Sequence, residues 1–313
     1  MRPVVYTKER EGEWNAFVTN AKNSLFMFHR SYMDYHSDRF SDHSFMFYED
    51  DELCGLLPAN LSGNCLYSHQ GLTFGGLLLS DKAKQHTAQD CFEALLSQLR
   101  SEGISKLVYK AVPHIYHRQP AEEDLYCLHR AGAVLSAVSA STVVNLSAPL
   151  KMPKGRKAQI ARAKREGVEV RLLTEKEDYV RFMALEDKVL TERHDKKAVH
   201  SAEEMWLLHS RFPEEIRLFG AMLSGELIAG SVVFVYPQLV HTQYMAADET
   251  ARRIGALDLV IAGLIEEYAS QKLWLDFGIS TEDDGHYLNE GLIAQKEGFG
   301  GRTNIYGKWE LQL

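Results

Sequence analysis

The segment DETARRIGALDLVIAGLIEEYA, residues 248–269, predicts a strongly amphipathic helix directly after the strand LVHTQYMAA at 239–247. Gly255 and Ala256 fall in its first turn, where small side chains leave the backbone N–H groups open. The helix dipole adds positive potential there, and Arg252 and Arg253 reinforce it. The segment therefore predicts an anion site suited to a diphosphate. A plain helix start, with glycine for tight packing, is the alternative.

The elements around this segment predict a mixed α/β protein of two similar units. Residues 1–150 alternate strands and helices, among them the helix HTAQDCFEALLSQLRSEG at 86–103. Residues 151–313 begin with a basic helix and continue with two strands joined at Ser224-Gly225, a good hairpin turn. We expect two domains with these bounds, each a mixed sheet flanked by helices.

Composition limits the classes of function. The net charge of −8 argues against DNA binding by the whole chain. The four scattered cysteines lack C-x-x-C spacing, so we expect free thiols, no metal site and a cytoplasmic protein. No apolar run approaches the ~20 residues of a membrane span. Serine-hydrolase, zinc-protease and P-loop motifs are also absent from the sequence.

The order strand, Arg-x-x-Gly-Ala, helix, strand resembles the acyl-CoA-binding half of the GNAT acyltransferase superfamily. That family's loop reads Gln/Arg-x-x-Gly-x-Gly/Ala; Arg252 and Gly255 match it, and Leu257 departs from it. The chain is similar to the Fem-like branch, which fuses two GNAT-type units. Some members use aminoacyl-tRNA and others are associated with acyl-CoA. The resemblance implies acyl-CoA as co-substrate, held by Arg252, Arg253, Gly255 and Ala256, and no tightly bound cofactor.

Four further stretches resemble the same branch. SHQGLTFGGLLLS at 68–80 and LTERHDKKAVHSAEE at 190–204 resemble segments of relatives from polysaccharide gene clusters. KGRKAQIARAKREGVEVRL at 154–172 resembles the helix between the two units, and EGLIAQKEGFGGR at 290–302 resembles the ending of the substrate cleft. We therefore expect substrate contacts from His69, Gln70, Gly71, Arg193, His194 and His200. The glycines of the first stretch could instead permit a bulge and tight sheet packing.

The basic helix reverses the overall charge locally. Its segment carries seven cations and no acid before Glu166: Lys151, Lys154, Arg156, Lys157, Arg162, Lys164 and Arg165. These could bind the phosphates of a nucleotide-sugar, coenzyme A or tRNA, or form a solvated helix face. The lack of interleaved aromatic residues argues against a platform for single-stranded nucleic acid.

The candidate catalytic residues lie on two strands. On 239–247, alternation places Val240, Thr242, Tyr244 and Ala246 on one face, and His241, Gln243 and Met245 on the other. Asp276 sits at the end of the apolar strand in KLWLDFG at 272–278. We expect Asp276 or His241 to act as the base, with Tyr244 as a further catalytic candidate and Gln243 as a substrate contact.

The sequence thus predicts an N-acyltransferase that moves an acyl group from acyl-CoA to an amine. The resemblance implies an amino sugar or a cell-surface polymer precursor as acceptor, either small or linked to a lipid or nucleotide. One alternative is an aminoacyl-tRNA-dependent peptidoglycan transferase, which the absence of sustained heptads makes less favoured. The other is a non-catalytic double-GNAT module that binds a nucleotide-sugar.

Overall fold

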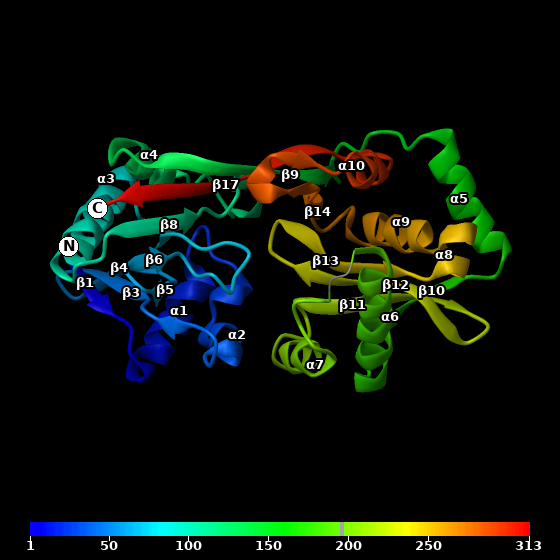
Figure 1. Cartoon of the computed structure of the whole chain (residues 1–313), viewed down its shortest axis with the longest axis horizontal. Coiled ribbons are helices and arrows are strands. Elements are labelled where there is room, and N and C mark those ends of the chain that lie inside the picture. Colours follow the sequence, from blue (N-terminus) through cyan, green and yellow to red (C-terminus); the bar gives the residue numbers. More distant parts are fainter. Residues whose placement is uncertain (195–196) are drawn as a thin grey trace. The chain divides into compact units, whose positions relative to one another are not determined.

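A computed structural model describes residues 1–194 and 197–313, without the side chains of residues 193 and 194. The chain divides into two compact units (Figure 1). Unit 1 comprises 1–139, 282–287 and 305–313, and unit 2 comprises 140–281 and 288–304. The division differs from the expected boundary at residue 150 because the strands β9 (Val134–Asn145) and β17 (Arg302–Gln312) each contribute residues to both units.

Unit 1 contains an antiparallel sheet in the order β1-β3-β4-β7 and a second group of strands in the order β17-β8-β6-β5-β2. Within the second group, β6 pairs with β8 in parallel. The strands are β1 Arg2–Val5, β2 Ser41–Asp42, β3 Phe45–Glu49, β4 Glu52–Leu57, β5 Asn60–Ser62, β6 Cys65–Tyr67, β7 Leu78–Leu79 and β8 Lys106–Lys110. The helices are α1 Glu11–Asn20, α2 Arg30–Met33, α3 Gln85–Ser101 and α4 Glu123–Arg130, with 3-10 turns at Lys8–Arg10, Phe26–Phe28, Asp34–His36 and His114–Tyr116.

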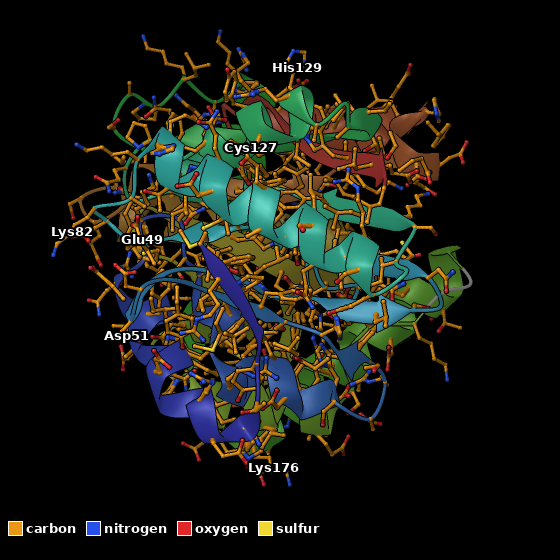
Figure 2. The ribbon with its side chains drawn as sticks, turned by 90° about the vertical axis from the view of Figure 1, so that its left-hand side faces the viewer. Glu49, Asp51, Lys82, Cys127, His129 and Lys176 are labelled. Atoms are coloured by element: carbon orange, nitrogen blue, oxygen red, sulfur yellow. The ribbon has the colours of Figure 1, made fainter. Side chains whose placement is uncertain are left out.

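The core of unit 1 forms under α3. The predicted helix is confirmed, and its apolar stripe, including Phe92 and Leu95, packs with Phe45 and Phe47 of the sheet. Cys127 of α4 belongs to the same core and lies beside α3 in Figure 2. The acidic turn between β3 and β4 is exposed, and Figure 2 shows Glu49 and Asp51 at the periphery of the unit.

Unit 2 is built on the strand order β10-β11-β12-β13-β14-β9. Neighbouring strands are antiparallel except β13 and β14, which are parallel. The strands are β10 Glu169–Leu173, β11 Ile216–Leu223, β12 Glu226–Val235, β13 Leu239–Ala247 and β14 Trp274–Ile279, followed by the short β15 Thr281–Glu282 and β16 Tyr287–Leu288 around a 3-10 turn at Asp283–Gly285. The helices are α5 Lys154–Arg165, α6 Lys176–His194, α7 Ala202–Arg211, α8 Glu249–Ile254, α9 Ala256–Tyr268 and α10 Glu290–Glu297.

Helices cover both faces of the unit 2 sheet. α9, with α5 and α8 beside it, lies on one face, and α6 and α7 lie on the other (Figure 1). Val233 and Val240 pack in the core beneath α9. On the opposite face, Phe182 of α6 lies against Gly230, where a Cβ atom would be 3.0 Å from its ring. Each strand of the sheet therefore has one side for each layer of helices.

Two local predictions in unit 2 are confirmed. Ser224 and Gly225 have φ of 51° and 87°, the left-handed pair that a two-residue hairpin requires. Ser201 caps α7: its hydroxyl accepts from the N–H of Glu204, whose carboxylate accepts from the N–H of Ser201. The loop before α7 is thereby fixed, and with it the neighbouring His200.

Within residues 1–194 and 197–313, no helix is long and apolar enough to cross a bilayer. The same ranges contain no cluster of His, Cys, Asp or Glu that could hold a metal ion. All four cysteines are free thiols.

Candidate active site

Strands β13 and β14 part from each other inside the unit 2 sheet. They pair only from Leu239 with Trp274 to His241 with Asp276. Beyond that point β13 stays with β12 as far as Ala247, whereas β14 pairs with β9. His241 and Asp276 are therefore the last facing pair before the strands separate, which is where an open sheet places functional side chains.

The two predicted base candidates are in direct contact. The Nδ1 atom of His241 lies 2.9 Å from an Oδ atom of Asp276, which has no exposed surface. The other oxygen of Asp276 accepts a hydrogen bond from the hydroxyl of Ser141 and one of 3.1 Å from the N–H of Gly278. Because these donors hold the carboxylate, it can fix the His241 ring with Nδ1 protonated, which makes Nε2 the basic nitrogen.

The backbone after β14 is shaped around this imidazole. Gly278 has φ 72°, and a Cβ atom there would lie 3.1 Å from Cε1 of His241. Lys296 of α10 donates hydrogen bonds of 2.9 and 2.8 Å to the carbonyls of Gly278 and Ile279. Burial lowers the pKa of Lys296 to about 8, although the nearby Asp276 charge acts in the opposite direction. The resemblance of the stretch at 290–302 pointed to this region of the chain, but not to this lysine.

A β-bulge in β13 alters the predicted alternation. Tyr244 faces Val232 and Thr242 faces Val233, so Gln243 has no partner residue on β12. The prediction that Thr242 and Tyr244 share a face is therefore wrong. The inserted residue places Tyr244 on the same face as His241, toward α6, and leaves Val240 and Thr242 on the face toward α9. A one-residue bulge leaves no signature in hydrophobic alternation.

The structure also joins Tyr244 to His200. The Tyr244 hydroxyl lies 2.6 Å from Nδ1 of His200 and 3.3 Å from its backbone nitrogen, which donates to it. Burial raises the pKa of Tyr244 to about 12. Tyr244 is therefore a neutral phenol near pH 7, able to donate a proton but not to act as the resting base.

Glu186 is a functional candidate that the sequence reading missed. It lies on the buried face of α6, at helical spacing from the buried Tyr179, Phe182 and Met183, and is 6% exposed. Burial raises the pKa of Glu186 to about 7, and Asp187 raises it further. A signal was present in the sequence, since an acid stands where the helical spacing calls for an apolar residue.

Comparison with known proteins gives the fold. Residues 154–287 match the family model described as an acetyltransferase (GNAT) domain. The crystal structure of FemX is similar over 100% of this chain and 98% of its own, with TM-score 0.70 and 12% identity. L-PGS from Bacillus licheniformis is similar over 97% and 91%, with TM-score 0.64 and 14% identity. A tandem GNAT protein from the clavulanic acid biosynthesis pathway covers 99% and 98%, with TM-score 0.51 and 13% identity.

The chain has the Fem-like double-GNAT fold. No curated protein matched the sequence. Unit 2 contains most of the matched GNAT domain, and the parting of β13 and β14 and the bulge at Gln243 both lie within that match.

In this second GNAT unit, the start of α9 differs from the open anion site expected from Gly255 and Ala256. Gly255 joins α8 to α9 with φ 80°, and a Cβ atom there would lie 2.7 Å from the carbonyl oxygen of Gln159 in α5. Ala256 has no exposed surface. The basic helix α5 therefore packs over the first turn of α9, where the backbone amides were expected to be open to a ligand.

The start of α9 already has an anion beside it, the carboxylate of a residue of the protein. The carboxylate of Asp258, in the first turn of α9, is paired with Arg156 of α5. The Arg156 guanidinium also donates 2.9 Å to the carbonyl of Gln295 and lies 4.1 Å from the ring centroid of Phe299. Arg252 and Arg253 remain exposed, and Arg252 donates to the carbonyl of Ala247.

The outer face of α5 keeps most of its positive charge exposed. Ala163 is buried and Arg156 and Ile160 are partly buried on the inner face, toward α9. The exposed cations are Lys154, Lys157, Lys164 and Arg165. The inner face of the basic helix therefore packs against unit 2 and is held there by Arg156. Its outer face presents cations that could bind phosphate.

The first GNAT unit uses the glycines of 68–80 for close packing. A Cβ atom on Gly75 would lie 1.8 Å from the carbonyl oxygen of Ser68, and one on Gly71 would lie 2.5 Å from His36 and Phe40. Gly75 is buried. The alternative of tight packing therefore describes these glycines, in place of the expected exposed backbone.

His69 and Gln70 interact within their own unit. His69 has φ 68°, is 3% exposed and stacks on His36 at 5.4 Å between ring centroids. Burial lowers the pKa of His69 to about 3. The backbone N–H of Gln70 donates to Asn60, whose side-chain amide donates back to the Gln70 side chain. The side chains of Arg193 and His194 lie outside the described part of the chain.

Proposed function

We propose that the protein is an N-acyltransferase whose chemistry takes place in the second GNAT unit. The observation that carries the proposal is the buried Asp276 carboxylate that orients His241 where β13 and β14 part. An ammonium must lose a proton before its nitrogen can attack an acyl carbonyl, and an imidazole oriented in this way is a suitable base.

The proposed reaction forms a C–N bond and breaks the bond between the acyl carbon and the donor's leaving atom. His241 Nε2 accepts the proton from the amine, and Asp276 stabilises the imidazolium. The backbone N–H of Gln243, at the bulge, is the proposed donor to the oxyanion, because the bulge removes it from the ladder. Tyr244, on the same face, is the proposed proton donor to the leaving group.

Acyl-CoA is the first donor we propose, as the loop around Arg252 and Gly255 implies. Its diphosphate would meet Arg252 and Arg253, which are exposed, rather than the covered amides of Gly255 and Ala256. The acceptor we propose is an amine of an amino sugar, or of a lipid- or nucleotide-linked polymer precursor.

Aminoacyl-tRNA is a second candidate donor, favoured by the covered start of α9 together with the exposed cations of α5. A phosphate backbone lying along Lys154, Lys157 and Lys164 needs no open helix terminus. Binding of this kind weakens strongly as salt increases, whereas a site for one diphosphate depends less on salt.

The test is a transfer assay with two donors on the whole chain. Acetyl-CoA and alanyl-tRNA are each incubated with amino sugars, and N-acyl products are measured by mass spectrometry. Product from one donor, lost in His241→Ala and retained in His209→Ala, supports the proposal and identifies the donor. The absence of product from either donor, with nucleotide-sugar binding detected by calorimetry, would instead establish a binding module.

A further inference from the structure

Glu186 has an unsatisfied carboxylate oxygen inside the second GNAT unit. Its Oε2 atom is buried and has no hydrogen-bond partner among the described residues. Its neighbours on the inward face of α6 are the apolar Phe182 and Met183. An unsatisfied buried carboxylate oxygen is costly to a fold, and a bound ion or a functional role is among the explanations for its retention.

The surroundings of Glu186 match a cation. Among the described residues, the charge that acts on Glu186 is that of Asp187, which is another acid. Helix α6 packs on β13, the strand that carries Tyr244, and the pKa of Tyr244 is raised by burial and further by the charge of Glu186. The Tyr244 oxygen also accepts from the backbone of His200, so this corner offers oxygen acceptors to a donor group.

We propose that Glu186 and the Tyr244 hydroxyl bind a primary ammonium group of a reactant. The proposal rests on the proposed function, and it adds that one substrate carries a positively charged amine held on the His241 face of the sheet. The ammonium has two possible sources: the acceptor amine before it is deprotonated, or the α-amine of an aminoacyl group on the donor.

The bulge connects this site to the proposed base. Because Gln243 is inserted, Tyr244 and His241 lie on the same face of β13. An ammonium beside Tyr244 is therefore on the side of the sheet where His241 and Asp276 meet. With regular alternation, Tyr244 would face the apolar layer under α9 instead.

The experiment measures binding without any donor. Calorimetry on the whole chain compares glucosamine with N-acetylglucosamine, and alaninamide with N-acetylalaninamide, so that each pair differs in the charged amine. The variant is Glu186→Gln. Its matched control is Glu177→Gln, the same change on the exposed side of the same helix.

We expect the wild type to bind one of the two amines and neither amide, with affinity falling at least about tenfold in Glu186→Gln and unchanged in Glu177→Gln. Glucosamine binding assigns the ammonium to the acceptor, and alaninamide binding assigns it to the donor. Binding of neither amine, equal binding of an amide, or unchanged affinity in Glu186→Gln would overturn the proposal.

Thermal unfolding separates this role from a structural one. Removing the charge of a buried carboxylate whose Oε2 atom has no partner should leave the melting temperature of Glu186→Gln unchanged or raise it. A clear fall would mean that the carboxylate supports the fold, against the proposal. Because binding is measured in the absence of transfer, a protein that binds amines without acylating them keeps this inference and loses the proposed function.

Discussion

His241 and Asp276 face each other across the last paired position of two parallel strands and are joined by a 2.9 Å hydrogen bond. Before this pair β13 and β14 are paired with each other, and after it β13 remains paired only with β12 and β14 only with β9. The contact therefore holds the imidazole against a buried carboxylate at the point where the pairing of the two strands ends.

Asp276→Asn should lower kcat by about 10²–10⁴, with little effect on donor affinity. The amide can donate to Nδ1 of His241 and so favour the tautomer whose Nε2 carries the proton. Steady-state kinetics check the expectation. Ser141→Ala, which removes one donor to the same carboxylate, should cost less. Equal values of kcat for Asp276→Asn and the wild type would show that the contact between His241 and Asp276 takes no part in catalysis.

Lys296 should make stability increase with pH. Its pKa is about 8 in the folded chain, against an ordinary value of 10.5, so between these values the unfolded chain binds the extra proton. The free energy of unfolding should therefore rise from pH 8 to 10.5, by at most about 3 kcal/mol. Urea unfolding of wild type and Lys296→Met over this range isolates the effect. Parallel curves for the two proteins would contradict it.

His69 should contribute to acid unfolding. Its pKa is about 3 in the folded chain and 6.5 ordinarily, because burial and the charges of His36, Lys110 and Arg30 oppose protonation. The unfolded chain then binds the extra proton below pH 6.5, so stability falls as the pH decreases toward 3. His69→Asn suits the left-handed backbone and should reduce this loss. Unfolding measured at about pH 7 and about pH 4.5 tests it, and an equal loss in both proteins would refute it.

Gly75→Ala should destabilise the chain by more than about 3 kcal/mol. The new Cβ would lie 1.8 Å from a backbone oxygen, that of Ser68, which cannot move aside as a side chain can. Gly12→Ala is the control, because nothing lies within 4 Å of its Cβ position in α1, and it should stabilise by about 0.5 kcal/mol. Chemical denaturation of both variants gives the comparison. Similar effects of the two would show that the turn at Gly75 can relax.

The ion pair between Arg156 and Asp258 should couple α5 to α9. Arg156→Met leaves a part-buried carboxylate unpaired and should cost about 3 kcal/mol, whereas Arg156→Met combined with Asp258→Asn should cost less than the sum of the single changes. A double-mutant cycle from urea unfolding measures the coupling. A coupling energy near zero would mean that α5 is held by Ile160 and Ala163 alone.

Much of the fold was predictable from local patterns. The left-handed hairpin at Ser224-Gly225, the cap at Ser201 and the stripe of α3 each depend on residues close in sequence. The boundary between the units was not predictable, because β9 and β17 contribute to both and composition does not change where they cross.

The candidate site was predictable only in part. Asp276 and His241 stood out as polar groups on apolar strands, but their contact depends on parallel pairing between segments 35 residues apart. The covering of Gly255 depends on α5, which is distant in the sequence, and neither helix shows this alone. Glu186 could have been predicted as a site residue, because the sequence shows an acidic residue at a position of α6 where the helical spacing predicts an apolar one.

The bulge at Gln243 implies that two different spacings can give the same arrangement of side chains. Deleting Gln243 would remove the insertion and restore plain alternation, so Thr242 and Tyr244 would keep their present partners on β12 and the phenol would stay on the same side of the strand as the histidine. Straightening the strand with Gln243 still present would instead turn the phenol toward α9 and bring Met245 to the histidine's side. Homologues should therefore place the tyrosine either three residues after the histidine in a bulged strand or two after it in a regular one.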